Sequence, residues 1–343
     1  MAGPVARSRP AVLAIDGGDS KTALALVARD GSLLTTMRIP RSSHVGLGRD
    51  GASFKALSDV IREACARMGI DLDGTPVAET GVYCLAGADL PADDRRIERA
   101  LRLKGWTSST LVRNDTFAVL RAGTDRGWGV GVVCGTGMNC SGVGPDGRVV
   151  RFAALGDISG DRAAGGGWLG RNALGAAIRA RDGRGPRTML ERLVPAHFRL
   201  ARPSSVMEAV YMGRIDERRL SELPPVVFRA AAQGDAVALA LLESVADEVV
   251  AMAGGAIRRL RLQAQDVEVI LGGGLFHRDD GPFLERVRLG IAAVAPRAAV
   301  RRLGVPPVIG AALLGLDHVG APRAAGARLR LSLLSHREAL PFG

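Results

Sequence analysis

The sequence predicts an α/β protein of two domains, each built on a mixed sheet, with a cleft between the domains. Its 343 residues are too many for one small core and fit two domains of ordinary size. Short apolar strands alternate with segments of helical periodicity in the first half of the chain. A glycine-hinged β-hairpin occurs twice, within residues 11–34 and again within residues 129–150. The repeated hairpin indicates a duplicated fold, and two related sheets leave a cleft between them.

The first domain, expected over residues 11–122, reads as one sheet backed by helices. Three strands are predicted within residues 11–40, and Asp30-Gly31 supplies the turn before the third. Apolar residues at helical spacing over 53–68 predict a helix, which Gly69 ends. The elements expected next are a buried strand, a helix, another strand and a short helix, at 80–87, 92–105, 108–114 and 116–122.

The second domain, expected over residues 123–318, opens with the second hairpin and is mainly helical after residue 150. Its later elements are expected to be a long helix, a buried strand and two further helices, at 236–262, 267–276, 282–294 and 308–316. The tail, 320–343, alternates Ala, Arg and Pro, so we expect it to be loosely held.

Composition indicates a soluble globular protein, with 47% hydrophobic and 24% charged residues. No apolar run is long enough to span a bilayer, and the N-terminus lacks the hydrophobic stretch of a signal peptide. We therefore expect a cytoplasmic protein without a membrane partner. The four cysteines, which show no metal-binding spacing, are expected to be small buried hydrophobes; they are Cys65, Cys84, Cys134 and Cys140.

The formal net charge of +11 raises the question of nucleic-acid binding. The basic residues are nearly all arginines, and they are scattered along the chain rather than gathered into a block with aromatic residues between them. No nucleic-acid-binding motif is present. A solvated basic surface is the interpretation we favour, with no nucleic-acid partner.

Three glycine-rich turns are the candidates for binding phosphate. Glycine lets the backbone approach an oxyanion closely and turn its N–H groups towards it. Each turn alone is weak support, because a glycine turn after a strand is commonly a hairpin without a ligand. Their residues are Gly17, Gly18, Ser20, Lys21 and Thr22 in the first turn, Gly135, Thr136 and Gly137 in the second, and Gly272, Gly273 and Gly274 in the third.

These turns, in this order, resemble the sugar kinase and ATPase superfamily that includes hexokinases and actin. Within it, the sequence resembles the N-acetylglucosamine kinase branch, grouped with the BadF/BadG/BcrA/BcrD ATPases, over about residues 11–318. The resemblance implies a duplicated ribonuclease H-like (actin-like ATPase) fold and the cofactors ATP and Mg²⁺. It also implies that the first two turns hold the ATP phosphates, that the third lies against the adenosine, and that Asp16 places the metal.

Asp115 is the candidate catalytic residue. Transfer of a phosphoryl group to a hydroxyl needs a carboxylate that accepts or orients the hydroxyl proton. From the residues alone, Asn114-Asp115 at a strand end is better explained by a helix cap. The resemblance favours the catalytic role, and one residue could serve both purposes.

The resemblance also implies the residues that contact the sugar. The first loop, 41–48, offers Ser43 and His44, although His44 is equally well an ordinary surface histidine. A second, glycine-rich loop over 155–170 offers Gly156 and Asp161, with Asp157 as the competitor of Asp161. Asn114, Asn139 and Asp115 are the remaining expected contacts. Leu155 stands where animal relatives have a Trp, which leaves the preference for an acetyl group open.

The function expected is therefore phosphorylation of the 6-hydroxyl of an amino sugar, foremost N-acetylglucosamine, at the expense of ATP. Glucosamine or another hexose is the near alternative. An activator ATPase of an acyl-CoA dehydratase shares the ATP-binding turns, but it needs cluster-binding cysteines. A sugar sensor without turnover is a third class, against which Asp16 and Asp115 argue. Similar kinases are commonly dimers, so a homodimer is compatible with the resemblance.

Overall fold

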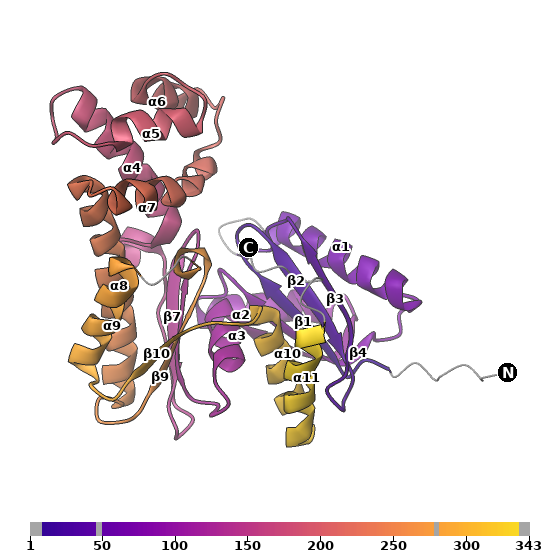
Figure 1. The fold of residues 1–343 in the computed structure, drawn as a ribbon. Helices are drawn as coiled ribbons and strands as arrows, with labels where there is room; N and C mark the ends of the chain where they lie inside the picture. Colours follow the sequence, from indigo (N-terminus) through magenta and orange to yellow (C-terminus); the bar gives the residue numbers. More distant parts are fainter. Residues whose placement is uncertain (1–8, 46–49, 278–280, 336–343) are drawn as a thin grey trace.

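The computed structural model describes residues 9–45, 50–277 and 281–335, and the statements below concern these residues. Two five-stranded sheets lie side by side, with a group of helices extending from the second sheet (Figure 1). None of the described helices has the length and apolarity that crossing a bilayer would require. The predicted fold class, an α/β protein with two related sheets, is confirmed.

The first sheet has the strand order β3-β2-β1-β4-β5. The strand β1 pairs antiparallel with β2 and parallel with β4, so the glycine hairpin forms one half of the sheet. The elements of this part are β1 (Val12–Gly17), β2 (Thr22–Val27), β3 (Leu33–Ile39), α1 (Asp50–Met68), β4 (Ala78–Leu85), α2 (Pro91–Arg102), β5 (Thr107–Arg113) and α3 (Asp115–Gly123).

The second sheet has the order β10-β9-β6-β7-β8 and the same pattern of directions, with β6 antiparallel to β7 and parallel to β9. Its elements are β6 (Gly129–Cys134), β7 (Met138–Val143), β8 (Val149–Arg151), α4 (Gly165–Arg181), α5 (Leu190–His197), α6 (Pro203–Tyr211), α7 (Pro224–Ala232), α8 (Ala236–Leu260), β9 (Glu268–Gly272), α9 (Pro282–Val294), β10 (Ala299–Arg302), α10 (Pro307–His318) and α11 (Arg323–Ser335). The helices α4 to α8 lie between β8 and β9, at the place where the first part has α1 between β3 and β4.

Side chains on alternate positions of β1 divide the first part into two cores. Leu13 and Ile15 face α1 and α2, in a cluster with Leu57 and Ile97. Val12 and its neighbours on the opposite face pack against α10 and α11. Period-two alternation in a strand covered on both sides produces this arrangement, which explains why the strand is apolar throughout.

The helices α3 and α10 lie between the two sheets (Figure 1). Ala118 of α3 belongs to the cluster that α10 forms with the first sheet. Val119 and Leu120 of the same helix pack against Ile270 in the second sheet. Because α3 contacts both sheets, its first residue is held at the junction between them.

The tail prediction was wrong for residues 323–335, which form the helix α11. Ala325 and Leu329 are buried in the cluster beneath the first sheet. Arg330 donates hydrogen bonds to the carbonyl oxygens of Ala122, Arg121 and Thr124, so arginines that suggested a solvated tail instead fix it. Residues 336–343 lie outside the described residues. The helix α10, at the end of the second predicted domain, packs on the first sheet.

Candidate active site between the two sheets

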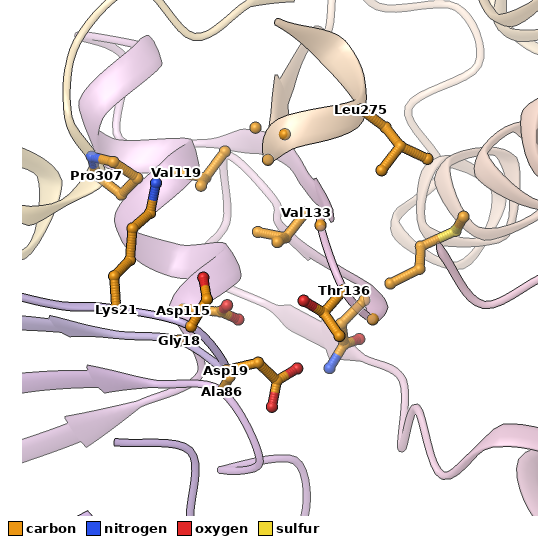
Figure 2. A pocket seen from close by; sticks show the side chains of 18 of the residues that line it. Gly18, Asp19, Lys21, Ala86, Asp115, Val119, Val133, Thr136, Leu275 and Pro307 are labelled. Carbon is orange, nitrogen blue, oxygen red and sulfur yellow. The ribbon is translucent and has the colours of Figure 1, made fainter. Parts of the chain in front are cut away.

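A cleft of about 520 Å³ opens between the sheets and is lined from both of them (Figure 2). This volume is within the range of about 300–1,000 Å³ that is usual for small-molecule sites. The structure brings most of the predicted site residues to it. Those that line the cleft are Asp16, Gly18, Ser20, Lys21, His44, Asn114, Asp115, Gly135, Thr136, Gly137, Asn139, Gly272, Gly273 and Gly274.

The first glycine turn joins β1 to β2 at the edge of the cleft. The N–H of Gly18 donates to the carbonyl oxygen of Lys21 at 3.0 Å, which closes the turn. Figure 2 shows Lys21 extending from the end of this turn along one wall of the cleft, towards Pro307 and Val119. This wall therefore carries a positive charge beside a backbone turn, which suits an anionic ligand.

Three other predicted residues lie behind the first turn and do not line the cleft. Thr22 is fully buried, and its hydroxyl donates to the Arg41 carbonyl oxygen at 2.8 Å. The Ser43 hydroxyl lies 2.8 Å from the same Thr22 oxygen and can donate to it. Ser43 is fully buried as well and fills the space where a side chain at Gly17 would stand. These residues brace the turn from behind.

Asp16 occupies the end of β1, on the wall of the cleft. Burial raises the pKa of its carboxyl to about 6, while the charges of Lys21 and Arg38 act in the opposite direction. Among the described residues, no group of three or more His, Cys, Asp or Glu side chains could hold a metal ion by itself. Mg²⁺ bound with a nucleotide needs only one or two carboxylates, because phosphate and water oxygens complete its coordination. Asp16 fits that role.

The second glycine turn joins β6 to β7 on the facing wall. A side chain added at Gly135 or at Gly137 would meet no other atom within 4 Å, so the space beside both residues is open. Figure 2 shows Thr136 of this turn across the cleft from Asp115. The two turns thus face one ligand space from different sheets.

The third glycine run follows β9. Gly272 packs against Val119, and Gly273 has a φ of +103° directly over the carbonyl of Cys134. A side chain at Gly274 would meet nothing within 4 Å. Only the last of these glycines leaves free space beside the cleft, whereas the first two allow close packing of the chain beneath it.

Asp115 is the first residue of α3 and lies in the cleft (Figure 2). The helix cap is Asn114, whose Oδ1 accepts the hydrogen bond from the Thr116 N–H at 3.0 Å. Burial raises the pKa of the Asp115 carboxyl well above its usual range, and the nearby charges of Asp16, Asp89 and Asp19 raise it further. Such a carboxylate is an effective proton acceptor once a ligand cation offsets its neighbours.

Asp89 is a cleft residue that sequence reasoning missed. It follows β4, and its Oδ1 accepts hydrogen bonds from the side-chain amides of Asn114 and Asn139, both at 2.8 Å. Asp16 lies near the end of β1 and Asn114 follows β5, the two strands that pair in parallel with β4 on either side. Polar residues at the carboxyl ends of parallel strands meet at one edge, so this signal was available in the sequence.

The second predicted sugar loop is placed at the margin of the cleft. Asp161 is buried, and its Oδ2 accepts hydrogen bonds from the Gly156 N–H at 2.9 Å and from Ser159 Oγ at 2.7 Å. Neither Asp161 nor Gly156 lines the cleft, although Ala154 and Ala164 on either side do. Asp157, the competitor, is not among the lining residues either.

The first predicted sugar loop is partly described. His44 lines the cleft, with its Nε2 4.0 Å from the carboxylate of Asp19. Residues 46–48 of this loop lie outside the described residues. The four cysteines are buried, as predicted, and burial is the foremost reason that the pKa of each thiol is raised.

Comparison of the whole chain with known proteins identifies a family and similar sequences. The model of the BadF/BadG/BcrA/BcrD ATPase family matches residues 13–315. The chain is 28% identical to the N-acetylmuramic acid/N-acetylglucosamine kinase of Clostridium acetobutylicum over 78% of this chain and 85% of that protein. It is 25% identical to the N-acetyl-D-glucosamine kinase of Dictyostelium discoideum over 90% of this chain and 99% of that protein.

Solved structures show the same fold. A candidate N-acetylglucosamine kinase from Chromobacterium violaceum superposes with a TM-score of 0.67 at 24% identity, covering 90% of this chain and 99% of that one. A second such protein, from Porphyromonas gingivalis, gives a TM-score of 0.59 at 19% identity, with the same coverage of both chains. The two-sheet architecture of this chain is therefore the fold of these two solved structures.

Proposed function

The chain belongs to the BadF/BadG/BcrA/BcrD ATPase family, and we propose that it is an ATP-dependent kinase of an N-acetylated amino sugar. The use of ATP follows from the family. The class of sugar is inferred from the curated relatives, which are kinases of N-acetylglucosamine and, in one case, also of N-acetylmuramic acid.

The observation that carries this proposal is the position of Asp115. It lies at the start of a helix packed between both sheets, in a cleft lined by the glycine turns of each sheet. Its cap function is already supplied by Asn114, so its own carboxylate is not required for starting the helix. Phosphoryl transfer to a hydroxyl needs a carboxylate that can accept the proton, beside groups that bind the phosphates. Asp115 lies beside the two glycine turns proposed to bind them.

In the proposed reaction, Asp115 accepts the proton of the sugar hydroxyl as the hydroxyl oxygen bonds to the terminal phosphorus of ATP. The bond between that phosphorus and the bridging oxygen breaks, and ADP leaves with the electron pair. The products are the sugar phosphate, ADP and a proton, which passes from Asp115 to solvent. The 6-hydroxyl is the proposed acceptor, because a primary hydroxyl is the least hindered one on a hexose ring.

The phosphates are proposed to lie between the two glycine turns, where backbone N–H groups and the Lys21 ammonium can offset their charge. When bound, Mg²⁺ would neutralise the charge that develops on the phosphates. Asp16 is the residue proposed to hold it. The adenosine would lie along the third glycine run, where Gly274 leaves space.

The sugar would occupy the end of the cleft near Asn114, Asn139 and Asp89. His44 is a further proposed contact there. Asp161, Gly156 and Ser43 remain predicted contacts that do not line the cleft, and Asp161 would have to exchange its bonds to Gly156 and Ser159 for bonds to the sugar. The burial of all four cysteines supports a kinase over an activator ATPase, since none is exposed at the surface to bind a cluster shared with a second subunit.

The test is a coupled ADP-release assay with N-acetylglucosamine, N-acetylmuramic acid, N-acetylmannosamine, glucosamine and glucose. We expect the highest kcat/KM with an N-acetylated sugar and none with its 6-deoxy analogue, which should inhibit competitively. ADP release that is equally fast without any sugar would indicate an activator-type ATPase. Sugar binding without ADP release would indicate a sensor.

A further inference from the structure

Asp89 belongs to a chain of hydrogen bonds that runs between the residues flanking α3 and the strand β7 of the second sheet. Its Oδ1 accepts from Asn114 Nδ2, which precedes α3, and from Asn139 Nδ2 on β7. Asn114 Oδ1 in turn accepts from the Thr116 hydroxyl, which lies 2.6 Å from the hydroxyl of Ser141 on β7. Asn139 and Ser141 are two residues apart and share one face of the strand.

Hydrogen bonds to their oxygens fix how both amides are oriented. Asn139 Oδ1 accepts the Cys140 N–H at 2.6 Å, and Asn114 Oδ1 accepts from Thr116, so both amide oxygens are occupied. Each Nδ2 carries two hydrogens and donates one of them to Asp89. Because both asparagines line the cleft, the second hydrogen of each is what they can offer to a ligand. Asp89 is the acceptor that the described residues provide for these two amide nitrogens.

We propose that Asp89 is a positioning residue, which holds the amides of Asn114 and Asn139 as paired donors and sets the start of α3, with Asp115, against β7. The proposal rests on the proposed function for its activity readout. It assigns no proton transfer and no metal to Asp89. Burial and the charge of Asp93 raise the pKa of Asp89 to about 7, and the protonated acid still presents a carbonyl oxygen to both amides.

The conservative variant separates positioning from direct chemistry. Asp89→Asn keeps an oxygen that both amides can donate to, whereas Asp89→Ala and Asp89→Ser lack one at that reach. We expect Asp89→Ala to lower kcat/KM for the sugar by about tenfold to a hundredfold, and Asp89→Asn to stay within about threefold of the wild type. The control is Asp73→Ala, which removes an exposed carboxylate in a turn and should leave kcat/KM as in the wild type.

A double-mutant cycle tests whether Asp89 acts through Asn139. If it does, Asn139→Ala should cost at least about threefold less in the Asp89→Ala background than in the wild type. An Asp89→Asn variant as impaired as Asp89→Ala, or effects of the two alanine variants that simply multiply, would overturn the proposal. If Asp89→Ala melts below the assay temperature, Asp89→Ser and Asp89→Asn decide the question.

A structural readout keeps this test independent of the substrate. The side-chain amide signals of Asn114 and Asn139 in ¹⁵N-labelled protein should move or broaden in Asp89→Ala and persist in Asp89→Asn. If the wild type phosphorylates no amino sugar but the signals respond in this way, the proposed function fails and the positioning role stands. If the sugar is phosphorylated but neither the signals nor kcat/KM respond to Asp89→Ala, the positioning role fails.

Discussion

The backbone N–H of Gly166 donates a hydrogen bond to the carbonyl oxygen of Gly135 at 2.8 Å, and the next N–H, that of Gly167, donates to Thr136 at the same distance. The first turn of α4 therefore holds the second glycine turn in place. Backbone donors at a helix start have no partner within the helix, so they are available for this contact. The glycine run before Trp168, which was expected within the glycine-rich loop of residues 155–170, begins the helix α4 and supports the predicted phosphate turn.

This contact predicts a specific effect of Gly165→Ala. Gly165 has a φ of +83°, and an added side chain would lie 2.5 Å from the carbonyl oxygen of Gly137. The strain should cost about 1–3 kcal/mol, lowering the Tm by several degrees and raising the KM for ATP about tenfold or more. Thermal melting and steady-state kinetics measure both.

The matched control lies on the same helix. A side chain at Gly175 would meet nothing within 4 Å, so Gly175→Ala should keep the KM for ATP and gain about 0.5–1 kcal/mol of stability. A Gly165→Ala protein with the Tm and KM of the wild type would show that α4 does not shape the phosphate turn.

Asp16→Ala is expected to remove metal-dependent turnover and spare the sugar. Its carboxylate lies in the cleft beside Lys21, at the end proposed for the phosphates. We expect kcat to fall about 100-fold or more at any Mg²⁺ concentration, while the sugar Kd measured by calorimetry without nucleotide stays unchanged. Loss of sugar binding with intact nucleotide turnover would mean that the two ends of the cleft are assigned the wrong way round.

The raised pKa of Asp89 predicts a pH-dependent gain in stability on its neutralisation. The folded-state value is about 7, against an unfolded value near 3.8, so folding favours the protonated acid. The stability that it contributes is complete below about pH 4 and is lost as the pH rises towards 7. The Tm of Asp89→Asn minus that of the wild type should therefore increase from pH 4 to pH 8.

The opposite sign is expected at Asp73, which serves as the control. The Thr75 N–H donates to this carboxylate and holds its pKa below the usual value, so its contribution is present at neutral pH and lost in acid. Asp73→Asn should thus lose Tm relative to the wild type as the pH rises, by a small amount because the group is exposed. Tm differences for Asp89→Asn that do not vary with pH would show that its carboxyl titrates normally.

The two sheets are expected to approach each other when both ligands bind. Predicted phosphate donors come from both sides of the cleft, Ser20 on one and Thr136 on the other, and the cleft between them is open to solvent. Contacts to one ligand from both sides favour closure. Solution scattering should give a smaller radius of gyration with sugar and a non-hydrolysable ATP analogue together. Identical profiles with and without the ligands would contradict closure.

Most of the strands, the repeated hairpin and the cleft could be predicted from the sequence, because alternation and glycine turns are local signals. The short strand β10 was missed. The direction in which individual side chains point could not be predicted. Thr22 and Ser43 are residue types typical of ligand contacts, but the register of β2 turns them towards each other behind the turn. Asp89 escaped notice because its partner Asn139 is 50 residues away in sequence. The helix α11 escaped because its arginines pair with distant backbone, as Arg330 does.

Asp115→Asn tests the catalytic assignment most directly. Asn114 caps α3, and Asn in place of Asp115 keeps the shape of the side chain, so the Tm should stay within a few degrees of the wild type. Asn cannot accept the hydroxyl proton, and a positioned proton acceptor contributes about 10²–10⁴-fold. We therefore predict that kcat on the best sugar falls at least about 100-fold while the Kd for ATP is nearly unchanged. A stable Asp115→Asn protein with near-normal kcat would contradict the assignment of Asp115 as the catalytic base.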